Sequence, residues 1–455
     1  MQQTKLWVLA AIFSSLSMKR PLIILFSFLL SIGASAVGDD STIITEPVNP
    51  NATEEARQVY AVLRMLYGDK VVSGTVANVN WNIKEAQNVY KWTRKYPALN
   101  VFDFIQIYTS KDVNPNGWID YSNITVANSW WRAGGLVGAM WHWNVPTNDG
   151  NGWTCTPGSG NGDTSFDPQK AITPGTEEYA RIIKDMDQVA GYLKKMQDRG
   201  IPVLWRPLHE AAGNTSEYSG GKAWFWWGIK GAETYKQLWQ LMYDRFVNYH
   251  GLNNLIWVWT SQVGDKTWYP GDEYVDIIGR DNYGFTASKA KSEFTKLQNT
   301  FPNRMVVLAE CGHSSSNRVC DIQEMWDKGA KWGWFMTWYD YDYNEGKSTT
   351  HRHTDAEWWQ AAWDSGLAVD RTEMKQLLAD IKDGVHKPQM VNGKSLNSEW
   401  YDLSGRKINS QLPLRSRNSL ATPSAFSTIN SQLSTVNSQL PKGLYIVNGK
   451  KVAIK

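Results

Sequence analysis

Residues 203–210 read Val-Leu-Trp-Arg-Pro-Leu-His-Glu, a mostly apolar run that ends in an acid. A short apolar run of this kind is typical of a strand buried on both faces, as in a parallel sheet. Residues 305–310, Met-Val-Val-Leu-Ala-Glu, repeat the pattern. We therefore predict two buried parallel strands, each with a carboxylate, Glu210 or Glu310, at its C-terminal end.

Six further runs of the same kind flank these two. The eight predicted strands are Val71–Val76, Asn100–Gln106, Leu136–Trp143, Val203–Leu208, Leu255–Thr260, Val275–Asp281, Met305–Glu310 and Gly333–Tyr339. Apolar residues recur with helical spacing from Tyr179 to Met196, where Gly200 is placed to end a helix, and again from Tyr235 to Phe246. Eight strands alternating with amphipathic helices over roughly 300 residues predict an α/β fold, the (β/α)8 or TIM barrel.

An open, doubly wound parallel sheet is the alternative α/β arrangement. That fold carries a glycine-rich phosphate-binding turn after an early strand, and no early strand here is followed by one. The glycines of residues 158–162 lie in the long polar loop Asn144 to Gly175, which we expect to form one wall of a cleft. The barrel is therefore the favoured fold.

Composition and charge bear on the class of partner. The chain has 25 Trp and 20 Tyr, whose flat apolar faces and polar edges suit sugar rings, although many of the Trp must fill the core. Residues 37–386 carry about eight more acids than bases, because the excess of bases lies at the two ends of the chain. An acidic body argues against nucleic acid, whose binding needs clustered cations.

The chain divides into three parts. Residues 1–36 are predicted to be a signal peptide, because Lys19 and Arg20, an apolar run and Ala34-Ser35-Ala36 follow in order, with Met18 the simplest start. The apolar runs are too short for a membrane anchor, and we expect no spanning segment in the mature chain. Residues 37–386 are the predicted catalytic barrel, and residues 387–455 a low-complexity linker with a small β tail.

The tail repeats Asn-Ser-Gln-Leu at 409–412, 430–433 and 437–440, between segments 400–406 and 443–452 that alternate like paired strands with an Asn-Gly turn. These strands resemble the C-terminal sorting tails of the type IX secretion system, which predicts a secreted or cell-surface enzyme. A purely structural hairpin is the alternative. Cys155, Cys311 and Cys320 cannot form a disulfide framework, and a Cys311–Cys320 bridge or free thiols remain open.

The two acids are suited to glycosidic bond cleavage. In a (β/α)8 barrel the active site lies at the C-terminal ends of the strands, so Glu210 and Glu310 face one another across its mouth. Retaining glycosidases use two carboxyls in this way, one protonated and one ionised. Aromatic surroundings would raise the pKa of Glu210, and a hydrogen bond from Tyr283 would keep Glu310 charged. A salt bridge of either acid with Arg206 or Arg280 is the non-catalytic interpretation.

Three motifs resemble glycoside hydrolase family 26, whose best-known members are β-mannanases: residues 205–210 (Trp-Arg-Pro-Leu-His-Glu), 224–228 (Trp-Phe-Trp-Trp-Gly) and 308–310 (Leu-Ala-Glu). The resemblance covers roughly residues 53–370. It implies a retaining double displacement, with Glu210 as acid/base and Glu310 as nucleophile. Related families place Asn before the acid/base, whereas His209 stands here, as in family 26, and would face the 2-hydroxyl of the sugar.

The resemblance also implies sugar-binding positions. His142 would bind the sugar at the cleaved bond, Trp224 and Trp338 would stack on sugar faces, and Tyr283 would orient the nucleophile. Taken singly, His142 and Trp338 could instead be core residues. The long stretch Ala211 to Ala223 leaves the reach of Trp224 open.

We therefore predict a monomeric endo-β-1,4-mannanase acting on mannan, glucomannan or galactomannan without a cofactor. Activity on β-1,3-xylan or mixed-linkage β-glucan within the same family is one alternative. A non-catalytic glycan-binding barrel is another, and it is disfavoured because both acids are present. The run from His351 to Asp355 suggests a metal cluster, but a solvated loop near the cleft rim is favoured because no clear fourth ligand exists.

Overall fold

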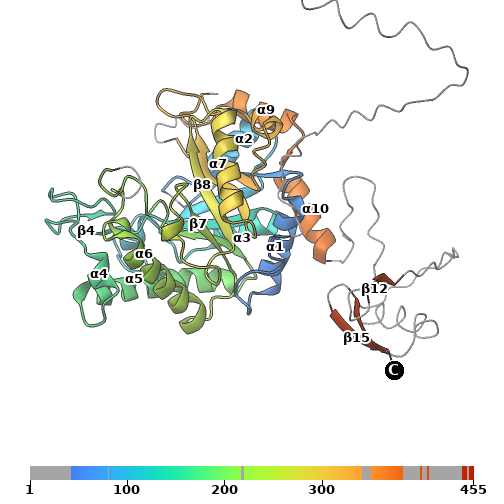
Figure 1. Cartoon of the computed structure of the whole chain (residues 1–455). Helices are drawn as coiled ribbons and strands as arrows, with labels where there is room; N and C mark the ends of the chain where they lie inside the picture. The colour runs from blue at the N-terminus through green and yellow to red at the C-terminus, as the bar shows by residue number, and fades with distance from the viewer. Residues whose placement is uncertain are drawn as a thin grey trace, which may run out of the picture.

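The computed structural model describes residues 42–382, apart from 80, 217–219 and 341–349, together with four short strands between 400 and 454. Eight parallel strands form a closed barrel: β1 (Val71–Val76), β2 (Leu99–Asp103), β3 (Leu136–Trp141), β6 (Val203–Pro207), β7 (Leu255–Thr260), β8 (Ile277–Tyr283), β9 (Met305–Gly312) and β10 (Trp334–Thr337). Each strand pairs with the next in chain order, and β10 pairs with β1 to close the ring. Figure 1 shows β7 and β8 of this barrel among the surrounding helices. The predicted barrel is confirmed, and each predicted strand is present with ends that differ by a few residues.

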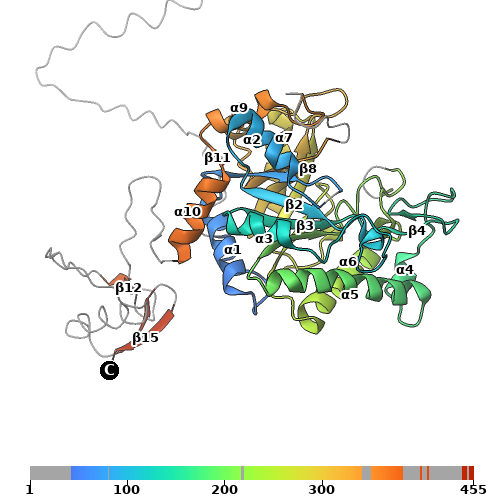
Figure 2. The same cartoon turned by 180° about the vertical axis from the view of Figure 1, so that it is seen from behind.

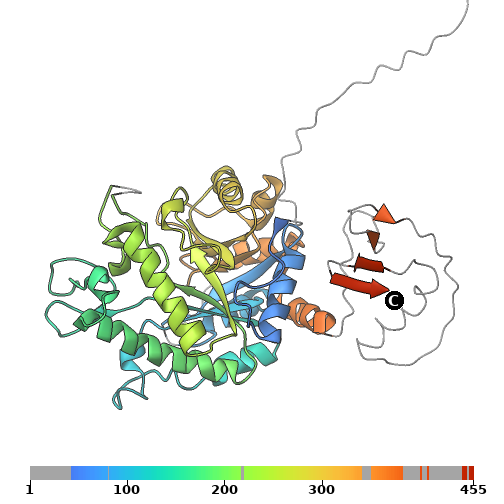
Figure 3. The ribbon, with the colours of Figure 1, turned by 60° about the horizontal axis from the view of Figure 1, so that its bottom comes forward.

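Helices surround the strands, as Figure 3 shows from below. They are α1 (Glu54–Leu66), α2 (Lys84–Thr93), α3 (Thr125–Arg132), α4 (Pro168–Ala171), α5 (Glu177–Gln197), α6 (Gly231–Tyr243), α7 (Ala287–Thr300), α8 (Ile322–Asp327), α9 (Ala356–Asp364) and α10 (Arg371–Lys382). The two helices predicted from periodicity are α5 and α6. Thr176 caps the start of α5, and Gly200, at φ +65°, lies just past its end.

The two ends of the described barrel meet. After α9 a short strand, β11 (Ala368–Val369), pairs in parallel with the start of β1, and α10 follows it. Helices α1 and α10 then lie side by side, which Figure 2 shows from behind. The segment before α1 is joined to the barrel near β7 and β8. Asp276 accepts hydrogen bonds from the backbone N–H groups of Val48 and Trp257, both 2.6 Å long.

Tryptophan fills much of the interior. Twelve Trp side chains are among the largest fully buried groups, at Trp130, Trp141, Trp143, Trp205, Trp226, Trp227, Trp239, Trp257, Trp259, Trp268, Trp332 and Trp359. Only Trp118, Trp153 and Trp224 are strongly exposed among the described residues. The aromatic surplus is therefore mostly core, and the exposed three are the candidates for contact with a ligand.

The loop after β3, predicted as a cleft wall, contains a small hairpin of β4 (Val145–Pro146) and β5 (Trp153–Thr154). Near the C-terminus, β12 (Trp400–Tyr401), β13 (Lys407–Ile408), β14 (Gly443–Val447) and β15 (Lys450–Ile454) form one antiparallel sheet. Within this sheet β12 pairs with β14 through Tyr401 and Ile446, and β14 pairs with β15. Residues 1–36, the repeats and the Asn-Gly turn lie outside the described residues. No helix in the described part of the chain is long and apolar enough to cross a bilayer.

Candidate active site

Glu310 lies within β9, and Glu210 lies three residues beyond the end of β6. The chain turns sharply at this point, because Leu208 and Glu210 have φ angles of +47° and +52°. Left-handed backbone at a non-glycine residue costs about 1–3 kcal/mol and persists only where its surroundings enforce it. The Tyr235 hydroxyl donates to the Leu208 carbonyl, and the Trp227 indole donates to the carbonyl of His209, both at 3.0 Å. Buried aromatic residues thus hold the turn that presents Glu210.

Arg206 connects the acids at the centre of the site. Its Nη1 donates to Glu310 Oε1 over 2.7 Å, and its Nη2 donates to Asp281 Oδ2 over 2.6 Å. Its Nε donates to the Thr260 hydroxyl, so all three guanidinium nitrogens are engaged. The side chains of Arg206, Asp281 and Glu310 are at most 7% exposed, so these charge-assisted bonds lie away from water.

Glu310 receives a second donor. The Tyr283 hydroxyl, at the end of β8, donates to Glu310 Oε2 over 2.7 Å, so each oxygen of the carboxylate accepts one bond. Burial nevertheless raises the pKa of Glu310 to about 7, with the charge of Asp281 adding to the effect and the bonds from Arg206 and Tyr283 opposing it. The arrangement fixes the orientation of both carboxylate oxygens.

Glu210 lies against a second carboxyl. Burial, and next the charge of Glu310, raise the pKa of Glu210, and its interactions with Asp281 and Arg206 oppose the rise. Burial also raises the pKa of Asp281, whose Oδ1 has no hydrogen-bond partner among the described residues. A raised pKa favours the protonated form of Glu210, which is the form that a general acid needs.

Two histidines adjoin the acids. Asp103, at the end of β2, accepts the His142 backbone N–H at 3.0 Å and lies 2.5 Å from its ring Nδ1. The other ring nitrogen of His142 lies 3.2 Å from Nε2 of His209. Burial opposes a charge on His142, but Asp103 outweighs it and raises the pKa of His142, whereas burial lowers the pKa of His209 well below its ordinary range. These opposite shifts favour a proton on His142 over one on His209.

Aromatic side chains border this centre. Trp338 follows β10, is 8% exposed, and has its ring centroid 6.0 Å from that of His142. Trp224 is 42% exposed and lies against Gly213, where an added Cβ would be 2.4 Å from its ring. Because Gly213 is three residues from Glu210, the long stretch 211–223 returns Trp224 to the acid/base end of the site.

The predicted site residues Glu210, Glu310, His142, His209, Tyr283 and Trp338 are brought together, with Trp224 at the border. Arg206, Asp281 and Asp103 were not predicted as members. Alternation along the strands is the signal that could have found two of them, since Arg206 lies four residues before Glu210 and Asp281 two before Tyr283. The alternative of a salt bridge holds only in part: Arg206 pairs with Glu310 inside the site, whereas Arg280 pairs with Glu293.

The segment His351 to Asp355 is not the solvated loop that the sequence suggested. The His351 side chain is 2% exposed, and its Nε2 lies 3.0 Å from Glu85 Oε2 of α2. Its Nδ1 accepts the backbone N–H groups of His353 and Thr354, so the ring anchors the loop. Within the described residues, no three potential ligands of the His, Cys, Asp or Glu type lie close enough together to hold a metal.

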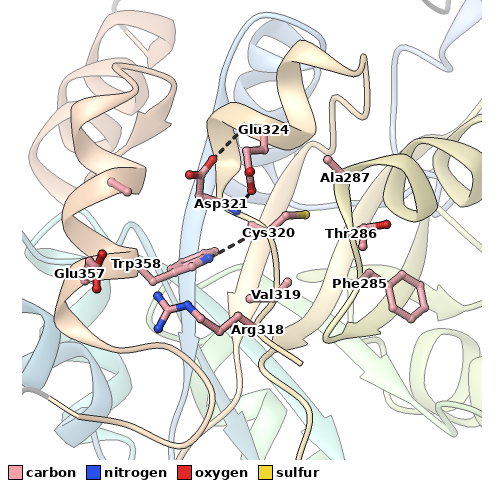
Figure 4. A pocket seen from close by; sticks show the side chains of 11 residues that line it. Phe285, Thr286, Ala287, Arg318, Val319, Cys320, Asp321, Glu324, Glu357 and Trp358 are labelled. Carbon is pink, nitrogen blue, oxygen red and sulfur yellow. Dashed lines mark hydrogen bonds between the residues drawn. The ribbon is translucent and has the colours of Figure 1, made fainter. Parts of the chain in front are cut away.

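All three cysteines are free thiols. Cys320 lines a pocket between the β8–α7 loop, the β9–α8 loop and α9, which Figure 4 shows with the Trp358 indole donating to the Cys320 carbonyl. Thr286 and Asp321, which cap α7 and α8, line the same pocket. None of the predicted catalytic or sugar-binding residues lines it, so this pocket is separate from the site.

Residues 48–364 match the family model described as glycosyl hydrolase family 26. The chain is 36% identical over 300 residues to a mannan endo-1,4-beta-mannosidase of Thermothelomyces thermophilus, covering 64% of this chain and 56% of that protein. It is 37% identical over 322 residues to mannan endo-1,4-beta-mannosidase B of Piromyces sp., covering 68% and 50%. The chain thus spans about half the length of these curated relatives.

Solved structures that resemble this chain are also named as mannanases. The family 26 domain of an endo-beta-mannanase/endo-beta-glucanase from Prevotella bryantii is 41% identical, with a TM-score of 0.67, covering 73% of this chain and all of that one. A beta-mannanase from a symbiotic protist of the termite Reticulitermes speratus, complexed with a gluco-manno-oligosaccharide, is 31% identical. It has a TM-score of 0.62 and covers 73% of this chain and 98% of that one.

Proposed function

The chain belongs to glycosyl hydrolase family 26, and from that premise we propose that it is a retaining endo-β-1,4-mannanase. The observation that carries the proposal is the pair of hydrogen bonds from Arg206 and Tyr283 that orient Glu310, with Glu210 near enough for the charge of Glu310 to raise its pKa. The centre thus holds one oriented carboxylate and one carboxyl whose protonated form is favoured. This is the pair that double displacement at a glycosidic bond requires.

In the first step, Glu310 Oε attacks the anomeric carbon of the sugar while the bond to the leaving oxygen breaks. Glu210 passes its proton to that oxygen, so the shortened chain departs as a neutral alcohol. In the second step, Glu210 takes a proton from water, whose oxygen attacks the anomeric carbon and releases Glu310. Two inversions return the anomeric carbon to its original β configuration.

The other side chains of the site suit these two reaction steps. Arg206 and Tyr283 hold Glu310 for attack, and Asp281 accepts a hydrogen bond from Arg206 and so helps to hold that guanidinium in place. The strained turn at Leu208 and Glu210 fixes the acid/base by backbone rather than by side-chain rotamers. His142 and His209 lie beside the acids, where hydrogen bonds to a sugar hydroxyl would strengthen as positive charge develops on the ring.

Azide rescue tests the two roles on an aryl β-mannoside with an activated leaving group. Glu210→Ala should be reactivated by azide and give the β-mannosyl azide, because Glu310 still forms the covalent intermediate. Glu310→Ala should give the α-azide by direct displacement. The configurations follow from NMR of the products, and the reverse assignment would exchange the two roles. Inversion by the unmodified enzyme would reject double displacement.

Initial rates on mannan, xylan and lichenan test the substrate. The names of the relatives favour mannan, and the protist enzyme was solved with a gluco-manno-oligosaccharide, so glucomannan belongs in the same comparison. A strong preference for lichenan or xylan would reject the mannanase proposal while leaving the two-carboxyl mechanism in place. If mannan is preferred, product profiles on mannohexaose show whether cleavage is internal.

Export is a separate proposal that rests on residues 18–36 and on the β tail. Mass spectrometry of the mature protein should find an N-terminus after Ala36 and show whether the tail is removed. If deletion of residues 400–455 leaves export and surface attachment unchanged, the tail has no sorting role.

A further inference from the structure

A hollow of about 550 Å³ lies between the loop after β1 and the loop after β2, at the rim of the barrel. Its lining includes Trp81, Trp118, Asp120, Asn123 and Thr125. We propose that this hollow, called the rim site below, binds a stretch of β-linked hexose polymer away from the bond that is cleaved. The proposal rests on the proposed function, because the polymer is the substrate assigned there.

Trp118 is the main argument for a ligand. Its side chain is 51% exposed, more than Trp153 or Trp224, and it makes no hydrogen bond or ring contact with any described residue. The exposure is built into the loop. Gly117, just before Trp118, packs so closely that an added Cβ would lie 2.1 Å from the Thr109 carbonyl oxygen. Ile119, just after Trp118, is buried, and its carbonyl oxygen accepts the Lys111 backbone N–H at 2.8 Å. A rigid loop therefore presents a bare indole face.

Trp81 also lines the hollow. It is 8% exposed, and its ring packs 4.6 Å from Phe102 and 5.2 Å from Phe104 between centroids. Its buried Nε1 has no hydrogen-bond partner among the described residues, and a buried donor without a partner costs about 1–3 kcal/mol. Its φ of +47° adds backbone strain of the kind that clusters at ligand clamps.

The polar rim identifies the ligand as neutral. Asp120, Asn123 and Thr125 contribute a carboxylate, an amide and a hydroxyl to the lining. The Oδ1 atoms of Asp120 and Asn123 accept hydrogen bonds within the loop, which leaves Asp120 Oδ2 and the Asn123 amide nitrogen for a ligand. No Lys or Arg is among the lining residues of this described hollow, so it lacks the cations that a nucleic acid or an anionic polymer requires. An aromatic face with a few hydrogen-bonding groups fits a neutral pyranose.

The rim site and the catalytic centre are linked through buried residues at the end of β2. Tyr121, next to Asp120, donates its hydroxyl to the Asp103 carbonyl oxygen at 2.8 Å. The side chain of Asp103 in turn holds His142. Both sites therefore lie at the C-terminal end of β2, where the proposal places the part of the polymer that extends beyond the cleaved bond.

Binding separates this proposal from catalysis. In the inactive Glu310→Ala background, retention on insoluble mannan, glucomannan, lichenan and xylan is measured with and without Trp118→Ala. Loss of one stacking contact should weaken binding about 3- to 10-fold on whichever polymer is retained. In the active enzyme, the same change should raise KM on the polymer by a similar factor and leave kcat/KM on mannotriose within about twofold.

Two matched variants control the experiment. Val113→Ala removes another exposed apolar side chain from the same loop, at 50% exposure, and should change nothing. Trp118→Tyr keeps a stacking face and should restore most of the binding. Equal binding by Trp118→Ala and Val113→Ala would overturn the rim site, as would an equal loss on mannotriose and polymer. If mannan is not hydrolysed but another polymer is retained through Trp118, the proposed substrate fails and the rim site stands.

Discussion

The Tyr283 hydroxyl donates to Glu310 Oε2 over 2.7 Å, the oxygen that Arg206 leaves unoccupied. A donor to the charged form stabilises it, so this bond lowers the pKa of a carboxyl that burial has raised to about 7. The active enzyme needs Glu310 ionised. The acid limb of its pH profile should therefore respond to this one hydroxyl.

Tyr283→Phe should move the acid limb of kcat/KM toward higher pH. Removing the donor raises the pKa of Glu310, and a hydrogen bond to a charged group, worth about 1.5–3 kcal/mol, corresponds to a shift of about one to two pH units. Activity near pH 5 should then fall more than activity near pH 8. Tyr249→Phe, at an exposed position, is the control. An unmoved limb, or one displaced to lower pH, would contradict the role of Tyr283.

Arg206→Lys should lose activity even though the charge is kept. One ammonium group cannot donate to Glu310, Asp281 and Thr260 from the fixed geometry of a guanidinium. Loss of a charge-assisted bond worth about 3 kcal/mol predicts a kcat lower by roughly 10²-fold, with a lower Tm as well.

Arg245→Lys separates the two effects, because Arg245 pairs with Asp187 outside the site. This variant should lose little activity. If Arg206→Lys lowers Tm but leaves kcat unchanged, Arg206 is a structural residue only.

Asp103→Asn should destabilise the enzyme more at low pH than at high pH. Asp103 raises the pKa of His142 above the unfolded value. The pairing therefore stabilises the fold fully below about pH 6.5, the unfolded pKa, and the contribution is lost as pH rises through the raised folded pKa. The difference in Tm between wild type and variant should be larger at pH 5.5 than at pH 8. A difference that does not change with pH would show that His142 is not protonated in the folded protein.

The barrel could be predicted from the sequence because strands buried on both faces are continuous apolar runs, and eight of them alternate with helical periodicity. The ends of most strands could not be predicted to the residue. Strand β9 continues past Glu310 to Gly312 because a polar residue at a barrel end need not terminate pairing with the neighbouring strand. The two acids were identifiable since each ends such a run.

The partners of these acids could not be predicted in the same way. Arg206 meets Asp281 across 75 positions, and His351 meets Glu85 across 266, so only the closed fold shows that these charges are paired. The polar neighbours of His351 suggested a solvated loop, although its side chain pairs with Glu85 in the interior. Long-range pairing of buried charges leaves no periodic signal in the sequence.

Gly213→Ala should weaken substrate binding through Trp224. A Cβ at this position would lie 2.4 Å and 2.5 Å from two atoms of the Trp224 ring, so the indole must move. If Trp224 stacks on a sugar, losing that contact costs about 0.5–1.5 kcal/mol, which predicts KM on the polymer about 2- to 10-fold higher. Gly162→Ala, where nothing lies within 4 Å of the added carbon, should behave as wild type.

A double-mutant cycle tests whether the effect passes through the indole. Trp224→Ala removes the ring, so adding Gly213→Ala to it should cost nothing more, because the added carbon then has no ring to displace. The Glu210 carbonyl oxygen would also lie 2.9 Å from that carbon. Additive losses, or a fall confined to kcat, would therefore mean that Gly213 acts on the backbone of the acid/base and not on Trp224.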